Sequence, residues 1–214
     1  MEAFTPQSAR ELIGSDCAQI LEIGANDGED TAAFLTAFPH PDTRIHSFEC
    51  DPRACQRWCD RIHDERATLW PFALADRKDW LPFHPSDGDA PGWDDYGPWD
   101  KSGSLLAPDK HTSYDPWLRF QPAVTVETHR LDDLWPADLR VFDLAWVDVQ
   151  GAEAIVLRGG QQTIRRIRWW YCECHQRPYY HGQASLPELC DLLPGFEFVR
   201  GYPGDNFLWR NTTL

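Results

Sequence analysis

The first third of the chain alternates short apolar runs with segments of helical periodicity. The apolar runs Gln19–Ile23, Arg44–Phe48 and Ala67–Leu74 have the length and composition of strands. The segments between them, Asp30–Phe38 and Pro52–His63, are predicted helices. A strand–helix–strand–helix–strand order predicts a parallel, twisted sheet with right-handed crossovers.

The last third of the chain resumes this alternation. Its pattern predicts strands over Val124–His129, Val141–Val149 and Trp169–Cys174, and a terminal antiparallel pair over Phe196–Arg200 and Asn206–Trp209. It predicts helices over Ala152–Arg166 and Leu186–Leu193, a short helix or turn at Leu131–Trp135, and a leading helix within Met1–Gly14. The sequence contains no internal repeat or linker, so we expect an α/β fold in a single domain, residues 1–214.

The first predicted strand ends in a glycine turn, Gly24-Ala-Asn-Asp-Gly28. In an open α/β sheet such a turn lies where nucleotide-like ligands bind. It lacks the G-x-G-x-x-G pattern of dinucleotide sites, and the acids Glu22 and Asp27 would repel a phosphate but suit a cation. Glu49 ends the second strand, where an acid can accept both hydroxyls of a ribose. A ribose without a pyrophosphate indicates S-adenosylmethionine, and the alternative is a tight turn beside a solvated acid.

A second group of polar residues follows two later strands. Asp148 stands near the carboxyl end of a buried strand, and Gly151 allows a sharp turn into the next helix. Glu173 and His175 end the neighbouring strand, and a period of two places them on the same face. We therefore expect three polar side chains to converge on one rim of the sheet.

The stretch from Asp76 to Gln121 is rich in Pro, Gly, Asp and Trp and has no lasting helical period. Its tryptophans argue against disorder. We expect an insertion, which could include a β-hairpin, that folds over the cofactor cleft as a wall for the acceptor. Trp93, Tyr96 and Trp99 recur at three-residue steps and could face a sugar ring or a polyketide-like skeleton. The alternative is a structural flap over a sheet edge.

Composition narrows the range of partners. The net charge of −14 argues against nucleic acid or an anionic membrane, because phosphates would be repelled. There is no apolar run of membrane-spanning length and no signal-peptide pattern. The seven cysteines are therefore expected to be reduced thiols of a cytoplasmic protein. Cys50, Cys55 and Cys59 lack the paired spacing of a zinc site, so no metal site is predicted.

Taken together, these stretches resemble the FkbM family of S-adenosylmethionine-dependent methyltransferases. The order and spacing of the matching blocks agree over nearly the whole chain. The blocks are Glu22–Gly28, Phe48–Pro52, Phe72–Asp76, Ser102–Leu105, Leu131–Leu134, Val147–Glu153 and Glu173–His175. The resemblance implies a Rossmann-like class I methyltransferase fold, with a mostly parallel seven-stranded sheet and helices on both faces. It also implies O-methylation of a small-molecule hydroxyl, on a sugar or another natural product.

Within these blocks, one set of residues is expected to bind S-adenosylmethionine and its product S-adenosylhomocysteine. They are Glu22, Gly24, Ala25, Asn26, Gly28, Glu49, Cys50, Ala73 and Asp148. His175 is the first candidate for a catalytic base, because an unperturbed histidine pKa of about 6.5 suits neutral pH. Asp148 is the second, as a base or as the residue that orients the hydroxyl. Glu173 would orient His175 or accept a substrate hydroxyl.

Several alternatives stay open. The family usually reads Lys-Ile-Asp-Val-Glu-Gly where this chain reads Trp146-Val-Asp-Val-Gln-Gly151, so the rim has lost a cation and an anion. Asp148 and Glu173 could instead bind one magnesium ion. His175 could be a hydrogen-bonded strand end, and Asp148 a helix cap. Two rival functions are a cofactor-binding module without catalysis and a nucleotide-dependent oxidoreductase.

Overall fold

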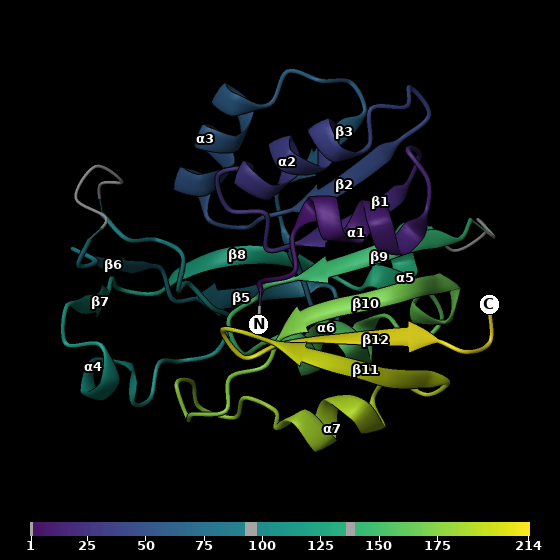
Figure 1. The fold of residues 1–214 in the computed structure, drawn as a ribbon. Helices are drawn as coiled ribbons and strands as arrows, with labels where there is room; N and C mark the ends of the chain where they lie inside the picture. The colour runs from purple at the N-terminus through teal and green to yellow at the C-terminus, as the bar shows by residue number, and fades with distance from the viewer. Residues whose placement is uncertain (1, 93–97, 136–139) are drawn as a thin grey trace.

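The computed structural model describes residues 2–92, 98–135 and 140–214. Its centre is a seven-stranded sheet in the order β11-β12-β10-β9-β1-β2-β3 (Figure 1). The strands are β1 (Gln19–Ile23), β2 (Arg44–Phe48), β3 (Ala67–Trp70), β9 (Phe142–Val147), β10 (Ile167–Glu173), β11 (Phe196–Tyr202) and β12 (Asn206–Asn211). Strands β3, β2, β1, β9 and β10 run parallel, and β12 and β11 pair antiparallel at one edge. The predicted parallel sheet and the predicted terminal pair are confirmed.

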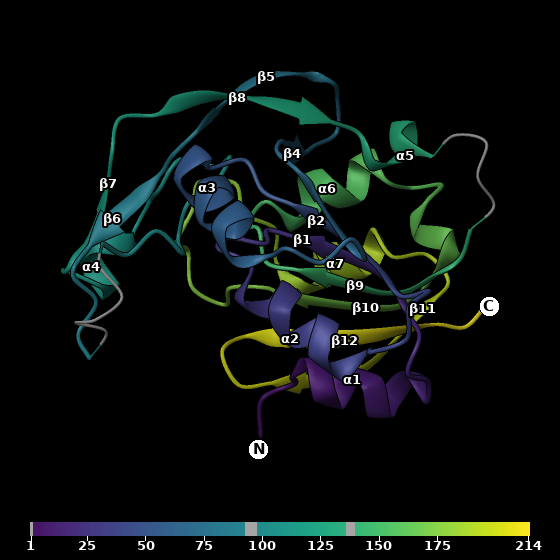
Figure 2. The same ribbon diagram turned by 90° about the horizontal axis from the view of Figure 1, so that it is seen from above.

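Helices cover both faces of the sheet (Figure 2). This is required because apolar side chains of each strand point alternately to the two faces. On one face, Ile20 and Leu144 pack with Phe34 under α1 (Pro6–Ile13) and α2 (Glu29–Ala37). On the other face, Leu21 packs with Val156 under the second group of helices. That group is α5 (Leu131–Leu134), α6 (Glu153–Gly159) and α7 (Leu186–Asp191). The side chains of Ile20 and Leu21, which are consecutive in β1, therefore point to opposite faces of the sheet and pack in different cores.

Helix α3 (Pro52–Arg61) packs beside α2 and begins directly at the end of β2. Pro52 occupies its first turn, where a missing N–H costs little. The Asp51 side chain caps it by accepting the backbone N–H of Arg53 at 2.9 Å. Trp58 then donates its indole N–H to the Thr31 hydroxyl of α2 at 2.9 Å. These contacts fix α3 against the turns that follow β1 and β2.

Two predicted elements are interrupted. The third strand, predicted over 67–74, is split at Pro71 into β3 and a separate β4 (Ala73–Leu74). Proline lacks the N–H that continues a ladder, so the chain leaves the main sheet there. The helix predicted over 152–166 ends at Gly159, and a 3-10 turn, η1 (Ile164–Arg166), follows. A β-carbon on Gly159 would lie 1.9 Å from the Ala75 carbonyl oxygen, so only glycine allows this close approach to β4.

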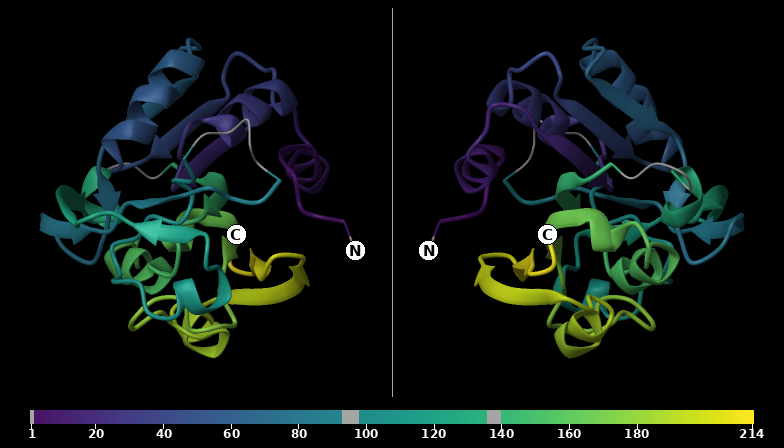
Figure 3. Two further views of the ribbon diagram at one scale, coloured as in Figure 1. Left: turned by 90° about the vertical axis from the view of Figure 1, so that its left-hand side faces the viewer. Right: turned by 90° about the vertical axis from the view of Figure 1, so that its right-hand side faces the viewer.

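The remaining strands lie outside the main sheet. Strand β4 pairs parallel with β8 (Val124–His129), and β8 pairs antiparallel with β5 (Asp79–Phe83). A second small sheet joins β6 (Ser86–Gly88) to β7 (Leu118–Phe120), with α4 (His111–Tyr114) beside it. The left view of Figure 3 faces this end of the molecule. In Figure 1 the arrowheads of β9 and β10 point toward it, so the insertion lies at the carboxyl ends of the parallel strands.

The aromatic residues singled out in the insertion are only partly described. Trp99 packs edge-to-face against Trp117, with ring centroids 5.6 Å apart. Trp93 and Tyr96 lie outside the described residues. No helix in the described part of the chain is long and apolar enough to cross a membrane. The single-domain organisation over residues 1–214 stays a prediction.

Candidate active site

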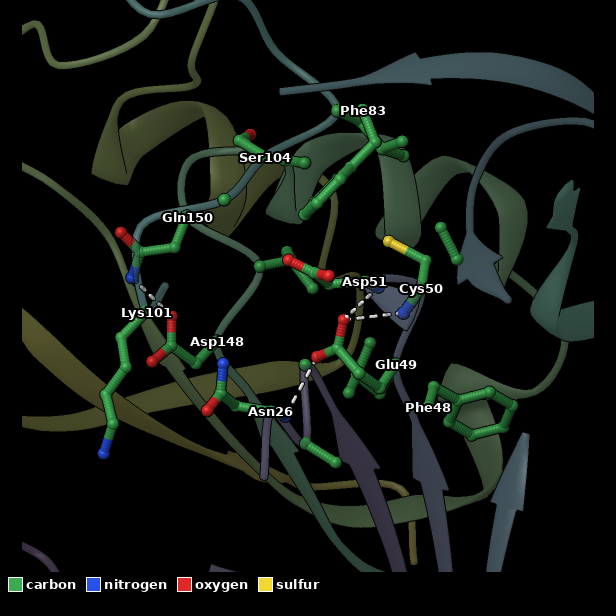
Figure 4. A pocket seen from close by; sticks show the side chains of 18 of the residues that line it. Asn26, Phe48, Glu49, Cys50, Asp51, Phe83, Lys101, Ser104, Asp148 and Gln150 are labelled. Carbon is green, nitrogen blue, oxygen red and sulfur yellow. Dashed lines mark hydrogen bonds between the residues drawn. The ribbon is translucent and has the colours of Figure 1, made fainter. Parts of the chain in front are cut away.

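A cavity lies at the carboxyl ends of the parallel strands, against the insertion (Figure 4). Its walls come from the turn after β1, the ends of β2 and β4, the turn after β9 and residues 100–105. The space free of protein atoms, counted with its mouth, is about 970 Å³.

Most of the residues predicted to bind the cofactor meet at this cavity. Those that line it are Gly24, Ala25, Asn26, Glu49, Cys50, Ala73 and Asp148. Glu22 and Gly28 are not among the lining residues. Gly28 has a φ of +80°, and a β-carbon there would lie 2.7 Å from Trp58. Its missing side chain therefore lets α3 pack against the start of α2, which is a different role from ligand approach.

Glu22 lies just beneath the cavity wall, fully enclosed. One carboxyl oxygen accepts the hydroxyls of Thr31 at 2.5 Å and Ser47 at 2.6 Å, and the other has no partner among the described residues. Burial raises the pKa of Glu22 to about 8. At neutral pH a neutral Glu22 therefore ties β1 to β2 and α2.

Glu49 occupies the centre of the cavity wall, between its two ends. Its Oε1 accepts the backbone N–H groups of Cys50 and Asp51, each at 2.7 Å. Its Oε2 accepts the backbone N–H of Asn26 at 2.9 Å. Burial raises its pKa to about 7, although these three bonds oppose the shift. Both lone pairs of Oε1 are thus taken, whereas Oε2 keeps one lone pair for a ribose hydroxyl.

The two ends of the cavity differ in chemistry. Phe48 lies on one side of the cavity, and Phe72, Leu74 and Phe83 add to its apolar lining (Figure 4). Asp148 lies on the other side with Lys101, and Asp30 also lines the cavity. Burial, and after it the charge of Asp148, raises the pKa of Asp30 to about 6, and Trp146 donates its indole N–H to Asp30 at 3.1 Å. An apolar end joined to an acidic one suits a flat base linked to a cation.

Asp148, Gln150 and Glu173 form one hydrogen-bonded group. The Gln150 amide nitrogen lies 2.6 Å from Oδ1 of Asp148 and 2.7 Å from Oε2 of Glu173. Asp148 is exposed, and it lines the cavity. Enclosure by the protein raises its pKa, while the bond from Gln150 opposes the rise. Burial and the nearby Asp148 charge raise the pKa of Glu173 well above its ordinary value.

The structure places His175 behind this group, off the cavity wall. Its Nδ1 lies 3.5 Å from Oε1 of Glu173, and its Nε2 is buried with no partner in the described residues. Its ring stacks on Tyr180 and lies 4.8 Å from Tyr179. Burial lowers its pKa, so the imidazole is neutral at pH 7. Only Asp148 of the three predicted catalytic residues lines the cavity.

The insertion is fastened across the cavity at several points. Arg57 of α3 pairs with Asp100, whose backbone carbonyl also accepts the Asn26 amide at 3.4 Å. On the opposite side, the Tyr180 hydroxyl donates to the carbonyl of Ser102 at 2.9 Å. Residues 100–105 are therefore held both to the loop after β1 and to the loop after β10.

Sequence reasoning missed several residues of the wall. Gln150 was noticed only as a departure from a family pattern, and Lys101, Ser104 and Phe83 were given no role. Gln150 and Ser104 both belong to blocks that carried the resemblance, which was the available signal. The described residues contain no group of three or more His, Cys, Asp or Glu side chains that could hold a metal ion. Magnesium bound by Asp148 and Glu173 alone, a site of two carboxyl groups, stays a hypothesis.

The mostly parallel seven-stranded sheet, with its antiparallel edge pair and a cavity at its carboxyl edge, has the architecture of a class I methyltransferase. Residues 22–202 match the family described as the methyltransferase FkbM domain. The 2-O-methyltransferase NoeI of Sinorhizobium fredii is 43% identical over 202 residues, which cover 91% of this chain and 80% of that protein. The chain belongs to the FkbM methyltransferase family. It is an S-adenosylmethionine-dependent O-methyltransferase, so the oxidoreductase alternative is wrong.

Solved structures agree on the fold. The FkbM methyltransferase of Methylobacillus flagellatus KT superposes with a TM-score of 0.57 at 15% identity, over 92% of this chain. This chain spans 44% of the length of that protein. A putative O-methyltransferase from Klebsiella pneumoniae gives a TM-score of 0.51 at 16% identity, over 98% of this chain and 80% of that one. The identities are low, so these two structures support the architecture alone.

Proposed function

We propose that this methyltransferase acts on a small molecule that carries a sugar ring, and that it methylates the hydroxyl on carbon 2. The position is the one that the name of the S. fredii relative states. The polar residues around Asp148 support a hydroxyl-rich acceptor, because Lys101 and Ser104 line the same cavity. Acidic residues on this wall and the net charge of −14 disfavour a polyanionic acceptor.

The cavity fits S-adenosylmethionine in this proposal. When bound, the cofactor supplies a methyl group on a cationic sulfur. Glu49 would accept a ribose hydroxyl at Oε2, since its carboxylate sits on the wall and this oxygen keeps a free lone pair. Cys50 and Ala73, near the apolar end, would pack against the base. Asn26, Asp30 and Asp148 would face the cationic end.

Asp148 carries the proposed chemistry. In-line transfer requires the acceptor oxygen to be held in position, which can contribute several kcal/mol to rate acceleration. A hydroxyl also has to lose its proton, and a base with a raised pKa removes it more readily. Asp148 is the candidate base that faces the cavity, and its pKa is raised by enclosure. Glu173 and His175 act through Asp148 in this scheme, because neither of them lines the cavity.

The class of the acceptor and the methylated position are tested with S-adenosylmethionine that carries a tritiated methyl group. The purified protein is incubated with a panel of pyranosides, and each substrate is paired with its 2-deoxy analogue. We expect label in the parent sugar and none in its analogue, with the methylated position read by mass spectrometry and NMR. Equal labelling of both members would overturn the position. Binding of S-adenosylmethionine without labelling of any sugar would overturn the acceptor class.

We also propose which partners the enzyme lacks and where in the cell it works. The acceptor is taken to be a free small molecule, with no nucleic acid or membrane partner. All seven cysteines are unpaired in the structure, which supports a reducing, cytoplasmic location.

A further inference from the structure

Gln150 has an unusual backbone for its residue type. Its φ is +53°, in the left-handed region that side chains other than Gly, Asn and Asp rarely adopt. Gly151 follows with a φ of +90°, and a β-carbon there would lie 2.8 Å from the Tyr180 ring. The chain therefore bends sharply at Gln150 and brings it against Tyr180. A strained residue of this kind needs surrounding contacts that hold it, and such residues cluster at functional sites.

Every polar atom of the Gln150 side chain is engaged. The amide nitrogen faces both Asp148 and Glu173, as described above. The amide oxygen faces the Tyr180 hydroxyl at 3.0 Å. The opposite orientation of the amide would point its oxygen at two carboxyl groups, so these partners fix which way it faces.

Tyr180 extends this contact toward the insertion. Its hydroxyl has one proton and two acceptors, Oε1 of Gln150 and the carbonyl oxygen of Ser102. The ring is fully buried, and burial keeps the pKa of Tyr180 well above its ordinary value, so the hydroxyl stays protonated. Gln150 and the carbonyl group of Ser102 therefore share the single proton of Tyr180.

We propose that Gln150 is a positioning residue for methyl transfer, which aims Asp148 at the acceptor and holds the Asp148–Glu173 pair in one protonation state. The proposal rests on the proposed role of Asp148 as the base. With both N–H groups donated, Gln150 stabilises the ionised form of each carboxyl group. Loss of that donation makes Asp148 harder to ionise and leaves it free to turn away from the acceptor.

The groups that face this pair come from several elements. They are Asp30 of α2, Glu153 of α6, Tyr171 of β10, His175 after β10, and Tyr180. In the described residues, Gln150 is the uncharged donor that contacts both carboxyl groups. Its removal therefore changes the pair in a predictable direction, while these neighbours stay as they are.

Gln150→Asn tests the proposal with little strain, because asparagine tolerates a left-handed backbone but is too short to reach both carboxyl groups. We expect kcat at neutral pH to fall by about tenfold or more. The acidic limb of the pH–rate profile should move up by about one pH unit, so that activity partly recovers at high pH. Affinity for S-adenosylmethionine should stay within about twofold, and carboxyl NMR titration of the free protein should show the same upward shift.

Two further variants separate positioning from general damage. Gln121→Asn makes the same change at an exposed amide, which donates to Asp87 at 2.9 Å far from the pair, and should leave rate and profile unchanged. Tyr180→Phe should shift the profile in the same direction by a smaller amount. Its effect should be less than additive with Gln150→Asn, because both act on one contact.

The outcomes are distinct. An unshifted profile in Gln150→Asn, or an equal loss of rate at every pH, overturns the positioning role. If Asp148→Asn keeps the wild-type rate, the proposed base is wrong and the failure lies with the proposed function. If Asp148→Asn is inactive while Gln150→Asn behaves like Gln121→Asn, the base stands and this inference alone fails.

Discussion

A β-carbon on Gly24 would lie 1.8 Å from the backbone carbonyl oxygen of Asp148. The turn after β1 and the turn after β9 are therefore in direct main-chain contact, and the glycine makes this contact possible. Glycine is therefore required at position 24 by the protein itself.

We expect Gly24→Ala to destabilise the fold, whether or not a ligand is bound. The φ of +91° alone costs about 1–3 kcal/mol for alanine, and the clash with Asp148 adds to this. Gly14→Ala is the matched control, since Gly14 has a φ of +71° and no atom within 4 Å of a β-carbon. The free energy of unfolding of both variants is measured in urea, and the difference between their losses of stability gives the cost of the clash. Equal losses of stability would show that the two turns can move apart freely.

Glu49→Gln should weaken S-adenosylmethionine binding by at least about tenfold, because hydrogen bonds to a charged group contribute roughly 1.5–3 kcal/mol. In the wild type, affinity should rise as pH increases through about 7, since that is where the ligand-free Glu49 loses its proton. Calorimetric titration between mildly acidic and mildly alkaline pH measures both effects. Wild-type affinity in the variant would mean that Glu49 only braces the loops.

Glu22→Gln should flatten the pH dependence of stability. Burial raises the folded-state pKa from 4.5 to about 8, so the folded protein holds a proton that the unfolded chain has released in this range. The stability that this proton contributes is complete below the unfolded pKa and is lost as pH rises through the folded one. Tm should therefore fall less in the variant than in the wild type between those values. Glu11→Gln, on the exposed side of α1, should not alter the slope.

Arg57→Gln should loosen the insertion over the cavity. The ion pair with Asp100 joins α3 to residues 100–105, and the Asp100 side chain is only 3% exposed. We expect KM for S-adenosylmethionine to rise several-fold, with faster cofactor dissociation in stopped-flow measurements. Arg119→Gln breaks the exposed pair with Asp89 and serves as the control, because such pairs contribute little. Similar kinetics in both variants would mean that the Arg57 pair does not fasten the insertion.

His175→Asn should reduce kcat by less than about tenfold, whereas Asp148→Asn should cost on the order of a hundredfold or more. His175 contacts Glu173 and not the cavity. Its pKa is lowered by burial, so it is already neutral at pH 7 and a higher pH should not rescue the variant. Equal losses at unchanged cofactor affinity would instead assign His175 a direct part in the reaction.

The sequence-based prediction was most accurate where the position in the fold by itself determines where a side chain lies. Glu49 was placed correctly because an acid at the end of β2 must face the carboxyl edge of the sheet. His175 was misplaced relative to the cavity because the argument used strand periodicity, and β10 ends at Glu173. Beyond that residue the chain turns, and alternation no longer determines the direction of a side chain.

The partners of the insertion could not be derived from pattern. The alternation in Val124–His129 indicated a strand but not its neighbours, and β8 pairs with β4 and β5 outside the main sheet. Pro71 marked the break between β3 and β4, yet a single proline does not say where the chain goes next. The role of Gln150 depends on Tyr180, thirty residues away in sequence, and only the folded structure brings them together.

The acidic end of the cavity has a consequence for the exchange of spent cofactor. The charge of Asp148 reaches Asp30 strongly enough to help raise its pKa, so both carboxyl groups act on the same small volume. A ligand with a positive charge there is favoured over a neutral ligand of the same shape. Methyl transfer removes that charge from sulfur, and the attraction to the wall falls as the product forms. We therefore expect the enzyme to bind the charged donor more tightly than the neutral product, so that the product inhibits it less.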